Sequence, residues 1–138
     1  MMRVLSISVG FIAATAFPSS AQQIDCANAM TQTAMNQCAY EDWQTQDALL
    51  NAAYAAAIEV LKDWDAALPA AQRGGVAALR DAQRAWITFR DKACEAEGYA
   101  MKGGSAEPLL VNSCKARLTE DRAGQLWQMV EVNDQDGG

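Results

Sequence analysis

Alanine content is the feature that most constrains the fold of this 138-residue chain. The sequence contains 28 alanines, concentrated in runs such as those at 51–57 and 75–79. Alanine is the best helix former and is depleted in strands. No segment alternates at period two with Val, Ile or Thr, as a half-buried strand would. We therefore predict an all-α protein with one domain, because this length supports one core but not two.

Proline, glycine and capping residues divide the chain into three predicted helices. The first is expected to begin after an N-cap at Thr31 and to run to about Ala67, ahead of Pro69. The second is expected from Val76 to about Glu97, with Gly98 as its C-cap. Its predicted buried positions are Leu79, Ala82, Trp86, Phe89 and Ala93.

The third predicted helix follows an irregular loop at residues 99–108. Pro108 suits the first turn of a helix, where its missing N–H is not needed. Thr119 could restart or kink this helix, and the tail at 133–138 is expected to fray. We expect the three helices to run up, down and up as a bundle.

The first 21 residues have the pattern of a secretory signal peptide. Arg3 supplies the positive start, an apolar run covers residues 4–17, and small residues precede a cleavage site after Ala21. The run is shorter than the roughly 20 residues that a membrane span needs. We therefore expect a helical domain at 22–138, periplasmic or secreted, with no membrane anchor after cleavage. Its net charge becomes −7, because Arg3 leaves a chain of net charge −6.

Four cysteines remain in the predicted mature chain: Cys26, Cys38, Cys94 and Cys114. An even number in a short exported protein indicates two disulfides, with three possible connectivities. A zinc site is the alternative, but the spacings of 12, 56 and 20 residues contain no C-x-x-C pair. We expect no metal.

The predicted bundle favours one disulfide connectivity. If the helices alternate in direction, all four cysteines lie at the same end. Pairing of Cys26 with Cys38 and of Cys94 with Cys114 then closes two short loops. Loop-closure entropy gives each bridge a stabilising effect on the order of 3 kcal/mol.

Composition excludes several functional classes. The chain has no histidine, which removes Ser-His and Cys-His nucleophile pairs and the common zinc motifs. A net charge of −6 argues against binding to nucleic acid, which requires clustered Lys and Arg. We therefore expect a protein that is not an enzyme and uses no cofactor.

Three segments carry distinctive motifs: T-x-x-x-M-N-x-C at 31–38, D-x-x-L-N-x-x-Y at 47–54 and Q-x-x-W-x-x-x-R-D-x-x-C at 83–94. Together they resemble the LprI-like lysozyme inhibitor family, formerly a domain of unknown function. Gly103-Gly104-Ser105, Cys114 and residues 122–126 extend the resemblance over about 26–130. Ala34 departs from the glutamate that often completes a capping box in the family. The resemblance implies an inhibitor that binds another protein non-covalently.

A polar cluster within these motifs is expected to be structural. Helical spacing places Trp86, Arg90 and Cys94 on one face. A buried arginine needs a carboxylate, and either Asp42 or Asp47 lies within its reach in an antiparallel pair. The expected cluster comprises Asp47, Asn51, Tyr54, Gln83, Trp86, Arg90 and Asp91.

The loop before the third helix is the candidate for partner binding. Long loops held by a rigid scaffold tend to carry function. Its candidate contact residues are Lys102, Gly103, Gly104 and Ser105. The glycines would let the backbone enter a narrow groove, and Lys102 and Ser105 could donate hydrogen bonds to carboxylates there. An ordinary flexible connector is the alternative.

The resulting hypothesis is an exported protein that occludes the cleft of a lysozyme. Its acidic charge would steer it toward a basic lysozyme. One alternative is a periplasmic binding or assembly module with another protein target. A second alternative is a small cell-wall hydrolase, although no pair of carboxylates stands out among the 17 acidic residues.

Overall fold

The computed structural model describes residues 24–136 and their side chains as far as Asn133. Three long helices account for most of this part: α1 at Gln32–Ala67, α2 at Gly75–Gly98 and α3 at Glu107–Asp136. Single-turn 3₁₀ helices lie at Cys26–Asn28 (η1), Ala70–Gln72 (η2) and Tyr99–Met101 (η3), and no strand occurs within residues 24–136. The all-α prediction is confirmed. The predicted signal peptide at 1–21 lies outside the described residues.

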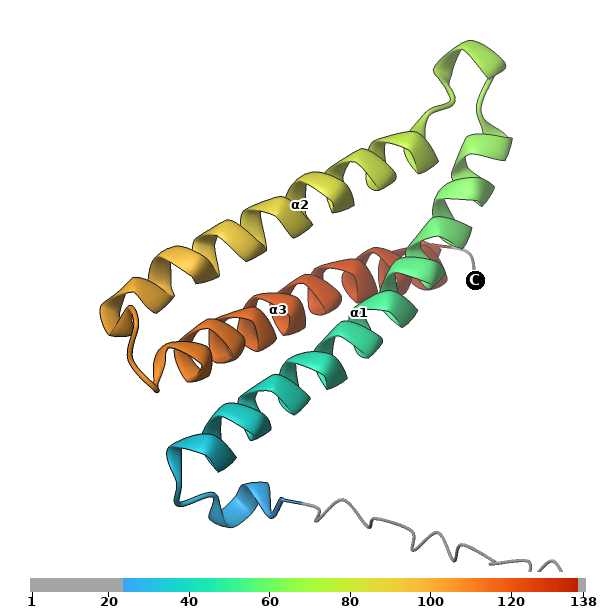
Figure 1. Cartoon of the computed structure of the whole chain (residues 1–138). Helices are drawn as coiled ribbons and strands as arrows, with labels where there is room; N and C mark the ends of the chain where they lie inside the picture. The colour runs from blue at the N-terminus through green and yellow to red at the C-terminus, as the bar shows by residue number, and fades with distance from the viewer. Residues whose placement is uncertain (1–23, 137–138) are drawn as a thin grey trace, which may run out of the picture.

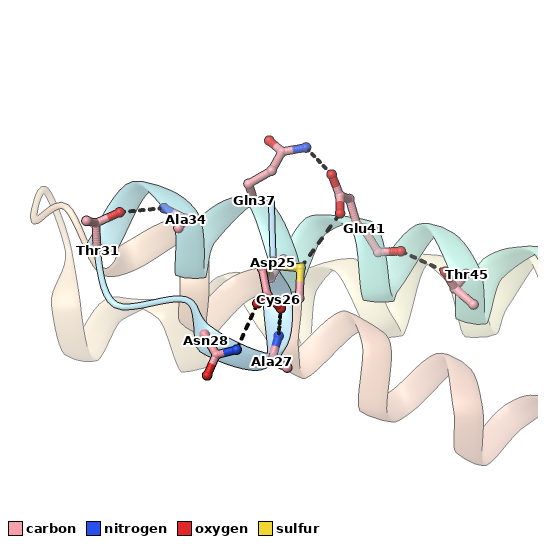
Figure 2. The surroundings of a disulfide bond; sticks show 10 residues. Asp25, Cys26, Ala27, Asn28, Thr31, Ala34, Gln37, Glu41 and Thr45 are labelled. Atoms are coloured by element: carbon pink, nitrogen blue, oxygen red, sulfur yellow. Dashed lines mark hydrogen bonds between the residues drawn. A yellow bond between two sulfur atoms is a disulfide. The ribbon is translucent and has the colours of Figure 1, made fainter. Parts of the chain in front are cut away.

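Side-chain caps begin the first two helices, η1 and α1. Asp25 accepts a hydrogen bond from the backbone N–H of Ala27 at 3.1 Å and starts η1 (Figure 2). Thr31 accepts one from the N–H of Ala34 at 3.2 Å, which caps α1 as predicted. Each cap satisfies an N–H group that has no partner within its own helix.

The start of α2 is capped by a residue of another helix. Gly74, at the N-cap position, has no side chain that could accept a hydrogen bond. Instead, Asp65 of α1 accepts hydrogen bonds from the N–H groups of Gly74, Gly75 and Val76 at 3.0, 2.9 and 3.2 Å. These bonds, that from Gly74 foremost, lower the pKa of Asp65. The carboxylate therefore fastens α2 to the end of α1, a contact that the sequence analysis did not anticipate.

The helices run up, down and up, so α1 and α3 are parallel (Figure 1). Asn36 Nδ2 donates to the carbonyl of Ser105 at 2.9 Å, and Trp64 Nε1 donates to Asn133 Oδ1 at 2.8 Å. Both bonds join residues 69 positions apart, so the two helices keep one register from end to end. The core between the helices consists of Leu50, Ala53, Ala57, Ile58, Leu61, Leu79, Ala123 and Leu126.

Two predicted core positions of α2 are wrong. Ala82 is exposed, and 60% of the Phe89 surface is accessible. The buried stripe of α2 instead consists of Leu79, Gln83, Arg90, Cys94 and Gly98. The prediction followed apolar residues, whereas two positions that face the other helices carry polar side chains.

Gly98 is not the left-handed C-cap that we expected. Its φ of −63° is helical, and the backbone continues directly from α2 into η3. A Cβ at this position would lie 2.5 Å from Cγ2 of Val111 on α3. The glycine is therefore required by the close approach of two helices.

The expected interruptions of α3 are also absent, because the helix is continuous from Glu107 to Asp136. Thr119 is completely buried within it, where its hydroxyl accepts a hydrogen bond from Arg90 at 3.3 Å. The prediction of a frayed tail is wrong for residues 133–136, and Asn133 is held by Trp64. Gly137 and Gly138 lie outside the described residues.

Both predicted disulfides are confirmed. Cys26 is bonded to Cys38, and Cys94 is bonded to Cys114. The first bridge folds η1 back onto α1 (Figure 2), and the second joins the last turns of α2 to the first turns of α3. One end of the bundle therefore carries both covalent links. None of the helices between residues 24 and 136 is both long and apolar enough to cross a bilayer.

Candidate functional site

Arg90 is the centre of a polar cluster that joins all three helices. Its Nη1 donates to Asp47 of α1 at 3.1 Å and to Thr119 of α3 at 3.3 Å, and its Nε donates to Asp91 at 3.0 Å. Only 7% of the arginine side chain is exposed. Asp42, the other carboxylate that we considered, accepts a bond from Gln46 instead.

Two tryptophans enclose the same guanidinium group. Its carbon lies 5.5 Å from the ring centroid of Trp43 and 5.2 Å from that of Trp86. Lys115 Nζ lies 4.4 Å from the Trp43 centroid and 3.8 Å from a carboxylate oxygen of Asp91. Cation–π contacts of this kind strengthen when the cation is shielded from water. Arg90 thus has two carboxylate counter-ions, a hydroxyl acceptor and a cation–π contact with each of two tryptophans.

The predicted polar cluster occupies two adjoining places in the structure. Trp86 and Asp91 surround Arg90 together with Asp47, as expected. The other members line a hollow of about 350 Å³ between α1 and α2, and one of them, Asn51, links the two places because its Nδ2 donates to Asp47 Oδ2 at 3.5 Å. The residues that line the hollow are Asn51, Tyr54, Arg80, Gln83, Arg84 and Ile87.

Sequence reasoning missed two partners of Arg90, Trp43 and Thr119. It also missed Lys115, which contacts Trp43 and Asp91 beside the arginine. Thr119 was expected to restart or kink the third helix. One signal was available, because Thr119 lies three residues after Ala116 and four before Ala123, on the apolar face that is buried. A polar residue in such a stripe indicates a buried hydrogen bond.

The predicted binding loop is ordered by its own contacts. Lys102 Nζ donates to Glu107 at 2.8 Å and lies 4.9 Å from the ring centroid of Tyr99. The N–H of Gly103 donates to the second oxygen of Glu107 at 2.7 Å. The hydrogen bond between Lys102 and Glu107 raises the pKa of Lys102 and lowers the pKa of Glu107, so both side chains stay charged.

The loop backbone is held on both sides of its tip. The N–H of Gly104 donates to the carbonyl of Met101 at 2.9 Å, and Asn36 of α1 binds the carbonyl of Ser105. Gly103 has a φ of +76°, a conformation that few residues other than glycine adopt. Every residue from 99 to 105 is exposed. The loop therefore presents an ordered tip at the disulfide-bonded end of the bundle (Figure 1).

These features define a small, acidic, disulfide-bonded three-helix bundle. Residues 25–126 match the family described as lysozyme inhibitor LprI, and the chain belongs to this family. It is 38% identical over 135 residues to an uncharacterised protein of Rhizobium meliloti (strain 1021), an alignment that covers 94% of this chain and 97% of that protein.

A solved structure has the same fold. The chain is similar to the crystal structure of a DUF1311 family protein from Pseudomonas putida KT2440, with a TM-score of 0.63 and 27% identity. The match covers 75% of this chain and 97% of that one. The resemblance noted from the sequence motifs is confirmed. The family and the two disulfides together indicate a protein that works outside the cytoplasm.

Proposed function

We propose that this protein is an exported, periplasmic or secreted inhibitor that binds a lysozyme non-covalently and blocks its substrate cleft. The match of residues 25–126 to the lysozyme inhibitor family carries the proposal. In this proposal the chain is not an enzyme, and its predicted signal peptide at 1–21 is removed on export. N-terminal sequencing of the exported protein should then begin at Gln22.

The loop at residues 99–106 is the proposed contact element. Its tip carries Gly103 and Gly104, which add no side chain and so suit a narrow groove. Beside the tip, Tyr99 and Met101 are exposed, and both residue types are enriched in protein interfaces. The hydrogen bonds within the loop and the nearby Cys94–Cys114 bridge reduce the conformational entropy lost on binding.

Lys102 is the proposed contact to the catalytic carboxylates of the lysozyme. Its ammonium group has three donors, one of which is bonded to Glu107, and 53% of its side chain is exposed. A carboxylate of the partner could therefore be bound while Glu107 stays in place. Ser105 supplies a second donor near the tip.

Charge supports a basic partner. Helix α1 carries six acidic residues and one basic residue, which gives it a net charge of −5. An acidic surface steers a basic partner toward the complex and increases the association rate. Inhibition should therefore weaken as salt concentration rises.

We assign the Arg90 cluster to the scaffold. Each polar contact of Arg90 is made within the bundle, and its side chain is almost inaccessible. In this assignment the cluster fixes α2 against α1 and α3 behind the loop. Its residues do not touch the lysozyme.

Lysis of bacterial cell walls by a basic lysozyme provides the test. The protein should protect the cell walls from lysis at near-equimolar ratio. Gly103→Asn should reduce inhibition at least about tenfold, since asparagine tolerates positive φ but adds a side chain at the tip. Gly124→Asn is the matched control, because nothing lies within 4 Å of that site on α3.

Three outcomes would contradict the proposal. If the protein protects cell walls from none of the lysozyme types, the proposed function is rejected and another protein target is favoured. Equal inhibition by the Gly103→Asn and Gly124→Asn variants would reject the loop as the contact element. Release of soluble products from peptidoglycan by the protein alone would favour the hydrolase alternative.

A further inference from the structure

The hollow between α1 and α2 differs chemically from the rest of this acidic molecule. Arg80 and Arg84 line it from α2, one helical turn apart. Two like charges at this spacing repel each other and destabilise a helix. Asp81 pairs with Arg84, whereas Arg80 forms no salt bridge within residues 24–133. The hollow therefore holds more positive than negative charge.

A third arginine, from α3, contacts a residue that lines the hollow. Arg122 Nε donates to Gln83 Oε1 at 3.1 Å, and Gln83 lines the hollow. Arg122 also binds Gln125, but it makes no ion pair with a carboxylate in the described chain. Burial lowers the pKa of Arg122. A partly buried cation without a counter-ion is unfavourable, and a bound anion would relieve this.

The neutral side chains of the hollow are also suited to a ligand with hydrogen-bond acceptor atoms. The oxygen of Gln83 is occupied by Arg122, so its NH₂ group is the part available to a ligand. Asn51 contributes a second amide, whose NH₂ group has one donor left beside its bond to Asp47, and Tyr54 contributes a phenol. Ile87, which is exposed, forms an apolar wall beside these donors. The combination matches a ligand that offers several acceptor oxygens on a small apolar body.

We propose that this hollow binds a small organic carboxylate, with Arg80 and Arg84 holding the charged group and Ile87 contacting the rest of the ligand. Arginine binds carboxylates through two parallel N–H donors, which gives both strength and orientation. A volume of about 350 Å³ accommodates one sugar acid or the end of a short peptide. The proposal does not depend on lysozyme inhibition, since the hollow and the loop at 99–106 are formed by different residues.

Two matched ligand pairs identify the source of the carboxylate. N-acetylmuramic acid and N-acetylglucosamine differ by the lactyl group that carries the acid. N-acetyl-alanyl-alanine and its C-terminal amide differ only at the peptide end. Each is titrated into the full-length mature protein while the side-chain NMR signals of Asn51, Gln83 and the arginine Nε–H groups are followed. We expect saturable shifts at the hollow with at least one acid and none with its neutral counterpart.

Variants localise the binding. Arg80→Gln should weaken the affinity for the acid about tenfold, as expected for loss of a charged hydrogen-bond donor. Arg117→Gln is the matched control: it removes the same charge from an exposed arginine that pairs with Glu97 near the other end of α2. Its affinity should stay unchanged. Neither position belongs to the proposed lysozyme contact.

Several results would overturn the proposal. These are an absence of saturable shifts with both acids at about 10 mM, equal binding of acid and neutral counterpart, and equal weakening by Arg80→Gln and Arg117→Gln.

Discussion

The two halves of α2 contrast in how they use arginine. In the C-terminal half, Arg90 is buried between two tryptophans and has two carboxylate partners. In the N-terminal half, Arg80 and Arg84 lie at the rim of a hollow, and only Arg84 is paired, with a carboxylate on its own helix. The same residue type therefore belongs to the scaffold in one half. In the other half it is available to a ligand.

The two halves of α2 also differ in how they are held to the neighbouring helices. The C-terminal half is bonded to α3 through Cys94 and packs so closely that Gly98 cannot carry a side chain. The N-terminal half is held at its start by Asp65. Rigid packing thus lies behind the loop that is proposed to contact a partner. The hollow lies mostly against the half of α2 that has no covalent link to another helix.

The largest expected effect comes from removing the bridge in the C-terminal half. Replacing Cys94 and Cys114 by alanine should lower the free energy of unfolding by about 3 kcal/mol or more, from loop-closure entropy and lost buried contacts. Urea denaturation measures this loss. In this variant, the amide-exchange protection of the C-terminal half of α2 should fall to the level of the N-terminal half. If the two halves already exchange equally in the unmodified protein, the contrast is wrong.

Arg90→Met should give the next largest effect. The change removes the arginine donor from Thr119, Asp47 and Asp91, at a cost of about 2–3 kcal/mol. This is below the usual cost for a buried pair because Asp47 and Asp91 remain 40% and 45% exposed. Arg84→Met is the control, and its ion pair with Asp81 is so exposed that we expect at most about 0.5 kcal/mol. Similar losses in the two variants would remove the distinction between the arginines.

Gly98→Ala tests the close approach of α2 and α3. The added methyl group would meet Val111, so the protein should lose about 1–2 kcal/mol on thermal denaturation. Gly124→Ala adds the same group where nothing lies within 4 Å. It should raise stability by up to about 1 kcal/mol, because alanine favours a helix interior. A stabilised Gly98→Ala variant would show that the helices are not in tight contact.

The smallest effect concerns the start of α2. Asp65→Ala removes the cap that Asp65 provides and should lower the melting temperature at pH 7, whereas Asp63→Ala should not. Because folding lowers the pKa of Asp65, its contribution is complete above the ordinary value of 3.8 and is lost as pH falls through the folded pKa. The difference between the original protein and Asp65→Ala should therefore shrink from pH 7 to pH 3. A constant difference would exclude the charged cap.

The sequence was sufficient to predict the helices and the disulfides, because both depend on local signals. Alanine runs, Thr31 and Pro69 mark α1, and the even cysteine count with alternating helices indicated the correct pairing. The errors concern contacts between helices. Gly98 does end α2, but glycine stands there because α3 approaches closely and not because it caps the helix. Thr119 was expected to kink the third helix, yet it is a position where α2 and α3 meet.

The candidate sites were predictable only in part. The pairing of Arg90 with Asp47 follows from charge and antiparallel spacing, so it could be anticipated. The contact of Arg122 with Gln83 beside the hollow could not be anticipated, because the two residues lie 39 positions apart in the sequence. The repeated positive charge at Arg80 and Arg84 was the one local signal for the hollow.

Displacement of a cleft ligand tests the central claim most directly. The trimer of N-acetylglucosamine is titrated into a basic lysozyme alone and into the same lysozyme saturated with this protein. If the loop at 99–106 occupies the cleft, the apparent Kd of the trimer should rise in proportion to the concentration of added protein. An unchanged Kd in the presence of a stable complex would contradict the account.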